Sequence, residues 1–212
     1  MKTADLINAL AAEPPSPPLR LGRRVGLALV LGAAISAALF MMALGPRIDF
    51  DHAAHTMRFD LKFVDTLALL LPSALLAARL LRPDARPGAL VAALVAPFIL
   101  LGGAVIVELV VVPADLWMTR LVGTNALHCL TLIPLMSIPP LTALIYAMRA
   151  GAPSHPALTG ALAGAAAAGA AATIYATNCT DDSPLFVASW YPLATLIVVA
   201  AGALAGRKWL QW

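Results

Sequence analysis

The stretch that most directly decides the fold is residues 157–176, ALTGALAGAAAAGAAATIYA, which contains no charged side chain. A helix of about 20 residues is about 30 Å long, which matches the hydrocarbon core of a bilayer. Small residues recur along it at four-residue spacing: Gly160, Gly164, Ala168 and Ala172. Such faces let helix backbones approach closely inside a membrane. We therefore expect a transmembrane helix here that packs tightly against a neighbour, and Gly202 and Gly206 repeat the spacing farther along the chain.

Five further apolar stretches of similar length surround this one and occupy most of the 212 residues. The predicted spans are Val25–Leu44, Leu61–Leu81, Ala89–Val112, Asn125–Met148, Ala157–Ala176 and Phe186–Gly206. Charged residues make up 12% of the chain, about half of the share in an ordinary soluble protein. The fold class that we expect is an all-α polytopic membrane protein with six transmembrane helices in one bundle. Because the remaining loops are too short for a soluble catalytic module, we expect neither an enzyme nor a cofactor.

The positive charges predict how the bundle is oriented. With six spans, one side of the membrane receives ten of the 14 basic residues: Lys2, Arg20, Arg23, Arg24, Arg79, Arg82, Arg86, Arg149, Arg207 and Lys208. Short loops rich in Lys and Arg stay in the cytoplasm, so both termini are predicted to be cytoplasmic. The expected organisation is a cytoplasmic segment at 1–24, a membrane domain at 25–206 and a tail at 207–212. Since these charges fix orientation, they do not indicate direct binding of nucleic acid.

Cys129 and Cys179 are the only two cysteines, and the predicted spans put both near the outer side. Cys129 lies near the start of the fourth span, and Cys179 follows the end of the fifth. Disulfides form and persist in oxidising compartments, so two thiols at similar depth there favour a redox role. The alternative is that each cysteine packs as a small apolar residue. A disulfide needs Cα atoms within about 7 Å, so the residues alone leave both interpretations open.

Polar residues at similar depth are candidate helpers of such a thiol site: His128, Asp181 and Glu108. Thiolates together with nitrogen and oxygen ligands suit zinc, cadmium or copper(I). However, His128 and Cys129 are adjacent on a predicted helix and point about 100° apart, so they cannot easily bind one ion. We therefore expect thiols that react with metals and no dedicated metal site.

The segment before the first span predicts a short amphipathic helix at residues 3–12, with Thr3 as its N-cap. A helix of about ten residues is rarely stable alone in water, so its apolar face requires a partner groove. Residues 13–18, EPPSPP, form a stiff spacer between this helix and the membrane. The predicted partner-contacting residues are Asp5, Leu6, Ile7 and Leu10.

Several of these features together resemble the NrsF-type membrane anti-sigma factors of proteobacteria. They are the opening MKTADLINALA, the proline-rich spacer, the six spans, His128-Cys129-Leu130, the single later cysteine Cys179, and the ending GRKWLQW at 206–212. The resemblance implies a protein of the bacterial inner membrane that holds a sigma-F-like extracytoplasmic-function (ECF) sigma factor inactive. It also implies release of that sigma factor under oxidative or heavy-metal stress, with Cys129 and Cys179 at the positions of the two sensing cysteines.

Two other classes of function compete with this interpretation. A small-molecule or metal-ion transporter is the main alternative, and it would need a polar pathway that the spans lack apart from residues near their ends. A membrane enzyme that handles disulfides would usually need an exchange-competent pair such as Cys-x-x-Cys, which is absent. Neither class explains the N-terminal helix and its spacer. The small-residue faces leave the oligomeric state open.

Overall fold

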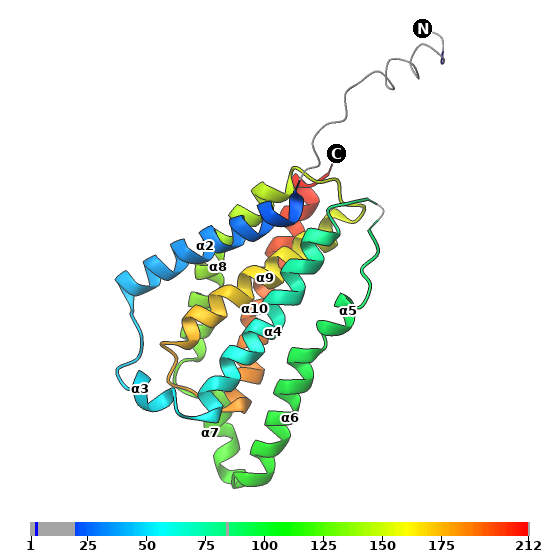
Figure 1. The fold of residues 1–212 in the computed structure, drawn as a ribbon. Helices are drawn as coiled ribbons and strands as arrows, with labels where there is room; N and C mark the ends of the chain where they lie inside the picture. The colour runs from blue at the N-terminus through cyan, green and yellow to red at the C-terminus, as the bar shows by residue number, and fades with distance from the viewer. Residues whose placement is uncertain (1–2, 4–19, 84, 212) are drawn as a thin grey trace.

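The computed structural model describes residue 3, residues 20–83 and residues 85–211. Every element that residues 20–83 and 85–211 form is a helix, as Figure 1 shows. Six segments are long and apolar enough to cross a membrane. The expected all-helical fold with six spans is therefore confirmed.

The observed helices agree closely with the predicted spans. The long helices are α2 (Leu21–Ala43), α4 (Met57–Arg79), α6 (Ala96–Val111), α8 (Ala126–Met148), α9 (Pro156–Ala176) and α10 (Pro184–Trp209). The short helices that connect them are α3 (Phe50–Ala53), α5 (Leu90–Ala93), the 3₁₀ helix η1 (Ala114–Leu116) and α7 (Trp117–Val122). The first and last long helices extend past the predicted apolar runs because Arg and Lys near a helix end can direct their charged groups toward water.

The third predicted span is interrupted, unlike the single helix that we expected. Its first turn forms α5, and α6 begins only at Ala96. Between them the backbone bonds of Leu94 and Val95 reach back three residues, to Val91 and Ala92. Pro97 explains the break because proline has no N–H to donate to the carbonyl four residues earlier.

The bundle has two distinct ends. The start of α2 and the end of α10 lie at one end (Figure 1), which we call the terminus end. The turns 80–89, from α4 to α5, and 149–155, from α8 to α9, lie at this end, and the Ala152 N–H donates to the Leu81 carbonyl over 2.9 Å. The opposite end contains α3, α7 and the connection from α9 to α10. We call it the cysteine end because Cys179 lies in that connection.

Helix α9 is the centre of the bundle and packs against α4, α8 and α10. Its contact with α10 at the terminus end requires glycine on both helices. A Cβ atom at Gly160 would lie 2.2 Å from the Gly202 carbonyl oxygen, and a Cβ at Gly202 would lie 2.4 Å from the Gly160 carbonyl oxygen. The close packing predicted from the four-residue spacing is confirmed.

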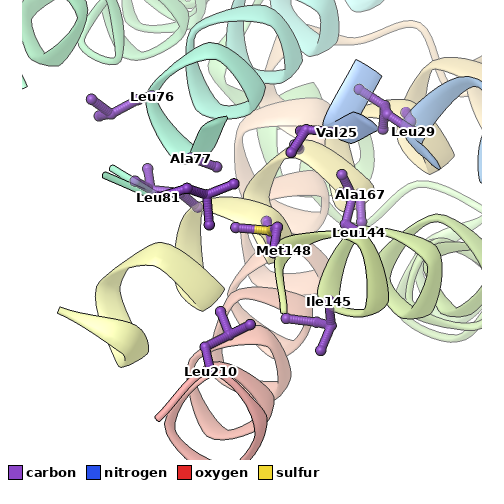
Figure 2. Packing of buried hydrophobic residues seen from close by; sticks show 14 of the residues in the cluster. Val25, Leu29, Leu76, Ala77, Leu81, Leu144, Ile145, Met148, Ala167 and Leu210 are labelled. Atoms are coloured by element: carbon purple, nitrogen blue, oxygen red, sulfur yellow. The ribbon is translucent and has the colours of Figure 1, made fainter. Parts of the chain in front are cut away.

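Buried apolar side chains form two clusters, one toward each end of the bundle. Figure 2 shows the cluster at the terminus end, where Leu81, Met148 and Leu210 meet from three parts of the chain. The second cluster lies toward the cysteine end and contains Cys129 and Cys179. The two cysteines therefore belong to one packed core.

Candidate functional site: a buried thiol pair

Cys129 and Cys179 come from different segments and meet in the interior. Cys129 is in the first turn and a half of α8, and Cys179 follows the last turn of α9, where its N–H donates to the Tyr175 carbonyl over 3.1 Å. Both residues are completely buried, and both thiols are free. The Cys129 thiol lies within hydrogen-bonding reach of the Cys179 sulfur. The shared depth predicted from the spans is thus accompanied by direct proximity.

Two tyrosines pack around the thiols. Tyr175 of α9 and Tyr191 of α10 are buried, and their ring centroids are 6.3 Å apart. Neither hydroxyl has an oxygen or nitrogen partner among the residues that the structure describes. The two sulfur atoms are the polar groups beside these hydroxyls. The two thiols therefore lie beside two phenol hydroxyls inside the buried cluster at the cysteine end.

The Cys179 loop, which we define as residues 177–183, is held by two cations. Lys62 of α4 is completely buried, and its ammonium group donates to the Cys179 carbonyl over 2.9 Å. The same ammonium group lies 2.5 Å from an Asp182 carboxylate oxygen. Arg47, in the connection from α2 to α3, donates to the second Asp182 oxygen over 2.8 Å and to the Cys179 carbonyl over 3.3 Å. Two positive charges thus fix the backbone on which Cys179 sits.

Asp181 connects the same loop to the start of α8. One of its carboxylate oxygens accepts hydrogen bonds from the N–H groups of Thr124 and Asn125, at 2.9 and 2.8 Å. The Asn125 side-chain amide adds another at 2.9 Å. Burial alone would raise the pKa of Asp181, but these hydrogen bonds outweigh it and hold the pKa below its ordinary value. The ionised carboxylate also suits the positive end of the α8 dipole, so Cys129 and Cys179 are fixed relative to each other.

Glu108 of α6 forms a separate centre beside this site. Its buried carboxylate accepts from Ser183 Oγ at 2.8 Å and from the Leu185 N–H at 3.0 Å, which satisfies the first turn of α10. Arg120 of α7 completes the arrangement with an ion pair at 2.9 Å. Glu108 therefore anchors the far side of the Cys179 loop, and its carboxylate partners are not the thiols.

The surroundings make Cys179 the more acidic of the two thiols. The hydrogen bond from Cys129 is the main cause, burial acts in the opposite direction, and the positive charge of Lys62 adds to the lowering. Together they lower the pKa of Cys179 to about 7. Since the thiolate is the form that attacks oxidants and binds metals, Cys179 is the more nucleophilic partner near neutral pH.

The other predicted site residues fall in different surroundings. The His128 side chain is exposed, although the neighbouring Cys129 is buried. No group of three or more His, Cys, Asp or Glu side chains in the described ranges is arranged to hold a metal ion. The predicted partner-contacting residues Asp5, Leu6, Ile7 and Leu10 lie outside the described residues.

Lys62, Arg47 and Asp182 are the residues of this site that the sequence reasoning did not identify. Lys62 begins an apolar run and looks like an ordinary interfacial charge. A signal was nevertheless present, because the predicted topology puts all three residues on the outer side, and opposite charges at equal depth are natural partners. Their pairing spans more than a hundred positions in sequence, which local patterns do not reveal.

Comparison with known proteins identifies relatives over the whole chain. Residues 10–212 match the family model described as NrsF, negative regulator of sigma F. The "Probable anti-sigma-F factor NrsF" of Azospira oryzae is 34% identical to this chain, and the "Anti-sigma-F factor NrsF" of Caulobacter vibrioides is 32% identical. Both alignments cover 100% of this chain and 100% of the relative. No solved structure matches the chain significantly. With a full-length match to the family and to two of its members, this chain belongs to the NrsF family of negative regulators of sigma F.

Proposed function

We propose that this protein is a membrane anti-sigma factor that holds an ECF sigma factor inactive and releases it when Cys129 and Cys179 are modified. The observation that carries the anti-sigma role is the full-length similarity to two anti-sigma-F factors. The observation that supports the sensing role is the contact between the only two thiols of the chain. A regulator of this kind works through binding, and it requires no catalytic residue.

The proposed location is the bacterial inner membrane, with both termini in the cytoplasm. The excess of Lys and Arg in the terminal segments and in the turns 80–89 and 149–155 supports this orientation. In the proposed orientation, the terminus end faces the sigma factor and the cysteine end faces the periplasm. The proposed organisation assigns sigma binding to residues 1–24, the sensor to the membrane domain at 25–206, and a short tail to 207–212.

The proposed sigma-binding surface combines the N-terminal segment with the adjacent turns. Asp5, Leu6, Ile7 and Leu10 supply the apolar face and the acidic first turn that the sequence analysis describes. The turns 80–89 and 149–155, at the end of the bundle where α2 begins, are bonded to each other, since Ser154 Oγ donates to the Pro83 carbonyl over 2.6 Å. A surface supported from both turns can respond to a movement of α8, which leads directly into the second turn.

The proposed signal is a covalent or coordinative change at the thiols. Oxidation by a peroxide joins the two sulfur atoms, and the two thiol protons and two electrons pass to the peroxide, which becomes water and an alcohol or a second water. A soft metal ion such as cadmium instead displaces the thiol protons and binds both sulfurs. Either change alters the contact between α8 and the Cys179 loop. A coupling free energy of about 1–3 kcal/mol would lower the affinity for sigma roughly 5- to 150-fold.

Co-purification of the full chain with its co-expressed sigma factor tests both parts of the proposal. We expect wild type to retain sigma and to lose it after treatment with hydrogen peroxide or cadmium. Deletion of residues 2–13 should abolish retention without any treatment. Cys129→Ala and Cys179→Ala should each retain sigma and resist release.

The control variant is Met118→Ala, which removes an exposed sulfur atom near the same end of the bundle. It should retain and release sigma as wild type does, because oxidation of an exposed methionine leaves the thiol pair unchanged. If sigma never co-purifies, the anti-sigma role is wrong. If both cysteine variants release sigma as wild type does, the anti-sigma role stands and the thiol switch is wrong.

A further inference from the structure

A cavity of about 320 Å³ lies between α4, α6, α9 and α10, separate from the thiol pair. Its walls are largely apolar, and two of its lining side chains, Phe98 and Leu196, are about two-thirds exposed on the surface of the bundle. That surface belongs to the part of the molecule that is long and apolar enough to cross a membrane. The cavity is therefore accessible to lipid-soluble molecules.

Three buried polar side chains line this cavity; in the part of the chain that the structure describes, two of them have no hydrogen-bond partner, and the third reaches only the sulfur of Cys179. They are Asp65, Ser73 and Tyr191, with exposures of 8%, 0% and 3%. Asp65 Oδ1, Ser73 Oγ and the Tyr191 hydroxyl have no oxygen or nitrogen partner among the described residues. A buried polar group without a partner is costly, and most such groups in proteins are paired. Asp65 and Ser73 without partners in one cavity, beside a tyrosine hydroxyl that has only a sulfur atom as its partner, indicate that a ligand supplies the missing hydrogen bonds.

The spacing of these groups restricts the shape of the ligand. Asp65 and Ser73 are eight residues apart on α4, which separates them by about 12 Å along the helix axis. A six-membered ring with oxygens at opposite ends, together with a hydrogen bond of about 2.8 Å at each end, spans about 11 Å, which is close to that rise. Asp65 and Tyr191 are eight and seven residues from the starts of their helices, so they lie at similar depth. They can share one end of the ligand while Ser73 contacts the other.

We propose that this cavity is a binding site for a small lipid-soluble ring with oxygen at both ends, of the quinone or hydroquinone class. The volume is sufficient, because a dry apolar cavity of about 150 Å³ already holds benzene in another protein. Hydroxyl and carboxyl groups can donate to a quinone carbonyl, and the hydroxyl groups can also accept from a hydroquinone. A lipid acyl chain or an unsubstituted ring fills the space but leaves the Asp65 and Ser73 side chains without partners.

The site adjoins the thiol pair through Tyr191. This side chain lines the cavity and also packs in the cluster that contains Cys129 and Cys179. The cavity nevertheless stands on its own observations, so its test requires neither a sigma factor nor modified thiols. Failure of one proposal therefore leaves the other unaffected.

Binding of ubiquinone-1 to the full chain in lipid nanodiscs tests the site, with empty nanodiscs as the background. Quenching of tryptophan fluorescence is a suitable signal, because Trp190 is adjacent to Tyr191. We expect saturable binding to wild type at one molecule per chain. Ser73→Ala and Tyr191→Phe conserve the apolar volume, and each should weaken binding roughly three- to tenfold through the loss of one hydrogen bond. Ala161→Leu, which fills part of the cavity, should abolish saturable binding.

Ser137→Ala is the matched control for Ser73→Ala. Ser137 is equally buried on another helix, but its hydroxyl donates to its own helix at the Ile133 carbonyl over 2.7 Å. It should bind ubiquinone-1 as wild type does, and the thermal unfolding temperature of each variant checks that the fold is intact. The proposal is overturned if ubiquinone-1 only partitions as it does into empty nanodiscs. It is also overturned if the Ser73 and Tyr191 variants bind normally, or if toluene displaces ubiquinone-1 at equal concentration, because the cavity would then be only an apolar space.

Discussion

The two ends of the bundle are held together by different physical forces. At the terminus end, α9 and α10 touch through glycine backbones, and apolar side chains fill the remaining space. At the cysteine end, the five ion pairs seen among the described residues link α4, α6 and α7 with the loops on either side. Shape complementarity does not change with pH or redox state, whereas charges and thiols do. The comparison teaches that a chemical signal can alter one end while the other keeps its geometry.

This division suits the proposed sensor. Under that proposal, a rigid terminus end would transmit a displacement of α8 to the turns 80–89 and 149–155, because packed helices shift as units. The cysteine end supplies the element that can change, since every connection at that end contacts the Cys179 loop or its anchors. Each of the following substitutions alters one end of the bundle and leaves the other intact, beginning with the largest expected loss of stability.

Gly160→Val should be the most destabilising change, because it introduces a side chain into a helix contact at the terminus end that has no free space. Its new Cβ would lie 2.2 Å from the Gly202 carbonyl oxygen, so α9 and α10 must separate. We expect the free energy of unfolding to fall by about 3 kcal/mol, at the upper part of the range for overpacked cores. Unfolding in mixed detergent micelles measures it. Gly102→Val on α6 is the control, because nothing lies within 4 Å of its new Cβ; equal destabilisation of both variants would contradict the close contact.

Lys62→Met should have the next largest effect and should act only at the cysteine end. It leaves the Cys179 carbonyl and Asp182 with Arg47 as their remaining cation. Because that second cation stays in place, we expect a loss of about 2 kcal/mol, below the cost of breaking an isolated buried pair.

The control for Lys62→Met is Arg58→Met, which removes a half-exposed cation 3.7 Å from Glu108. This ion pair should contribute less than about 1 kcal/mol to the free energy of unfolding. Because Lys62 also lowers the pKa of Cys179, reaction with a small thiol reagent should be compared at a pH of about 10, where Cys179 is ionised with or without Lys62. At that pH, faster reaction of Cys179 should accompany only the Lys62 change, since the loop that covers it is loosened. If both variants unfold alike and protect Cys179 alike, Lys62 does not hold the loop.

Asp181→Ala should have a smaller effect, because it removes only the link from the loop to α8. The carboxylate satisfies two backbone N–H groups at the start of that helix, and loss of such a cap typically costs about 1 kcal/mol. The pKa of Asp181 is lowered in the folded state, so this stability is present above the ordinary aspartate pKa and is lost as pH falls through the lowered value. Wild type and variant should therefore converge in unfolding free energy at acidic pH. A difference that persists there would contradict the assignment.

The sequence predicted the terminus end better than the cysteine end, for a physical reason. The apolar runs and the Gly160 spacing are local patterns, and they were sufficient for the spans and for the tight helix contact. The cysteine end depends on pairs such as Lys62 with Asp182, which are distant in the chain and meet only when the bundle forms. Cys129 and Cys179 were placed at one depth because depth follows from span boundaries. Their contact also depends on the rotation of α8, which periodicity does not fix in a helix that is apolar all round.

The acidity of Cys179 is the finest test of the cysteine end, because its largest cause is a single hydrogen bond from Cys129. Cys129→Ser and Cys129→Ala each leave one thiol, but only serine keeps a donor beside Cys179. With the donor, the pKa of Cys179 should stay near its value of about 7; without it, the pKa should rise toward the ordinary thiol value of about 8.5. Only the thiolate reacts, so the rate with methyl methanethiosulfonate should reach half its maximum about one pH unit higher in the alanine variant.

A lowered pKa in the fold also means that ionisation of Cys179 stabilises the fold as pH rises from about 7 to about 8.5. Identical rate profiles in the two variants would mean that Cys129 does not tune Cys179, and Lys62 and the Asp181 backbone would remain as the causes of its lowered pKa.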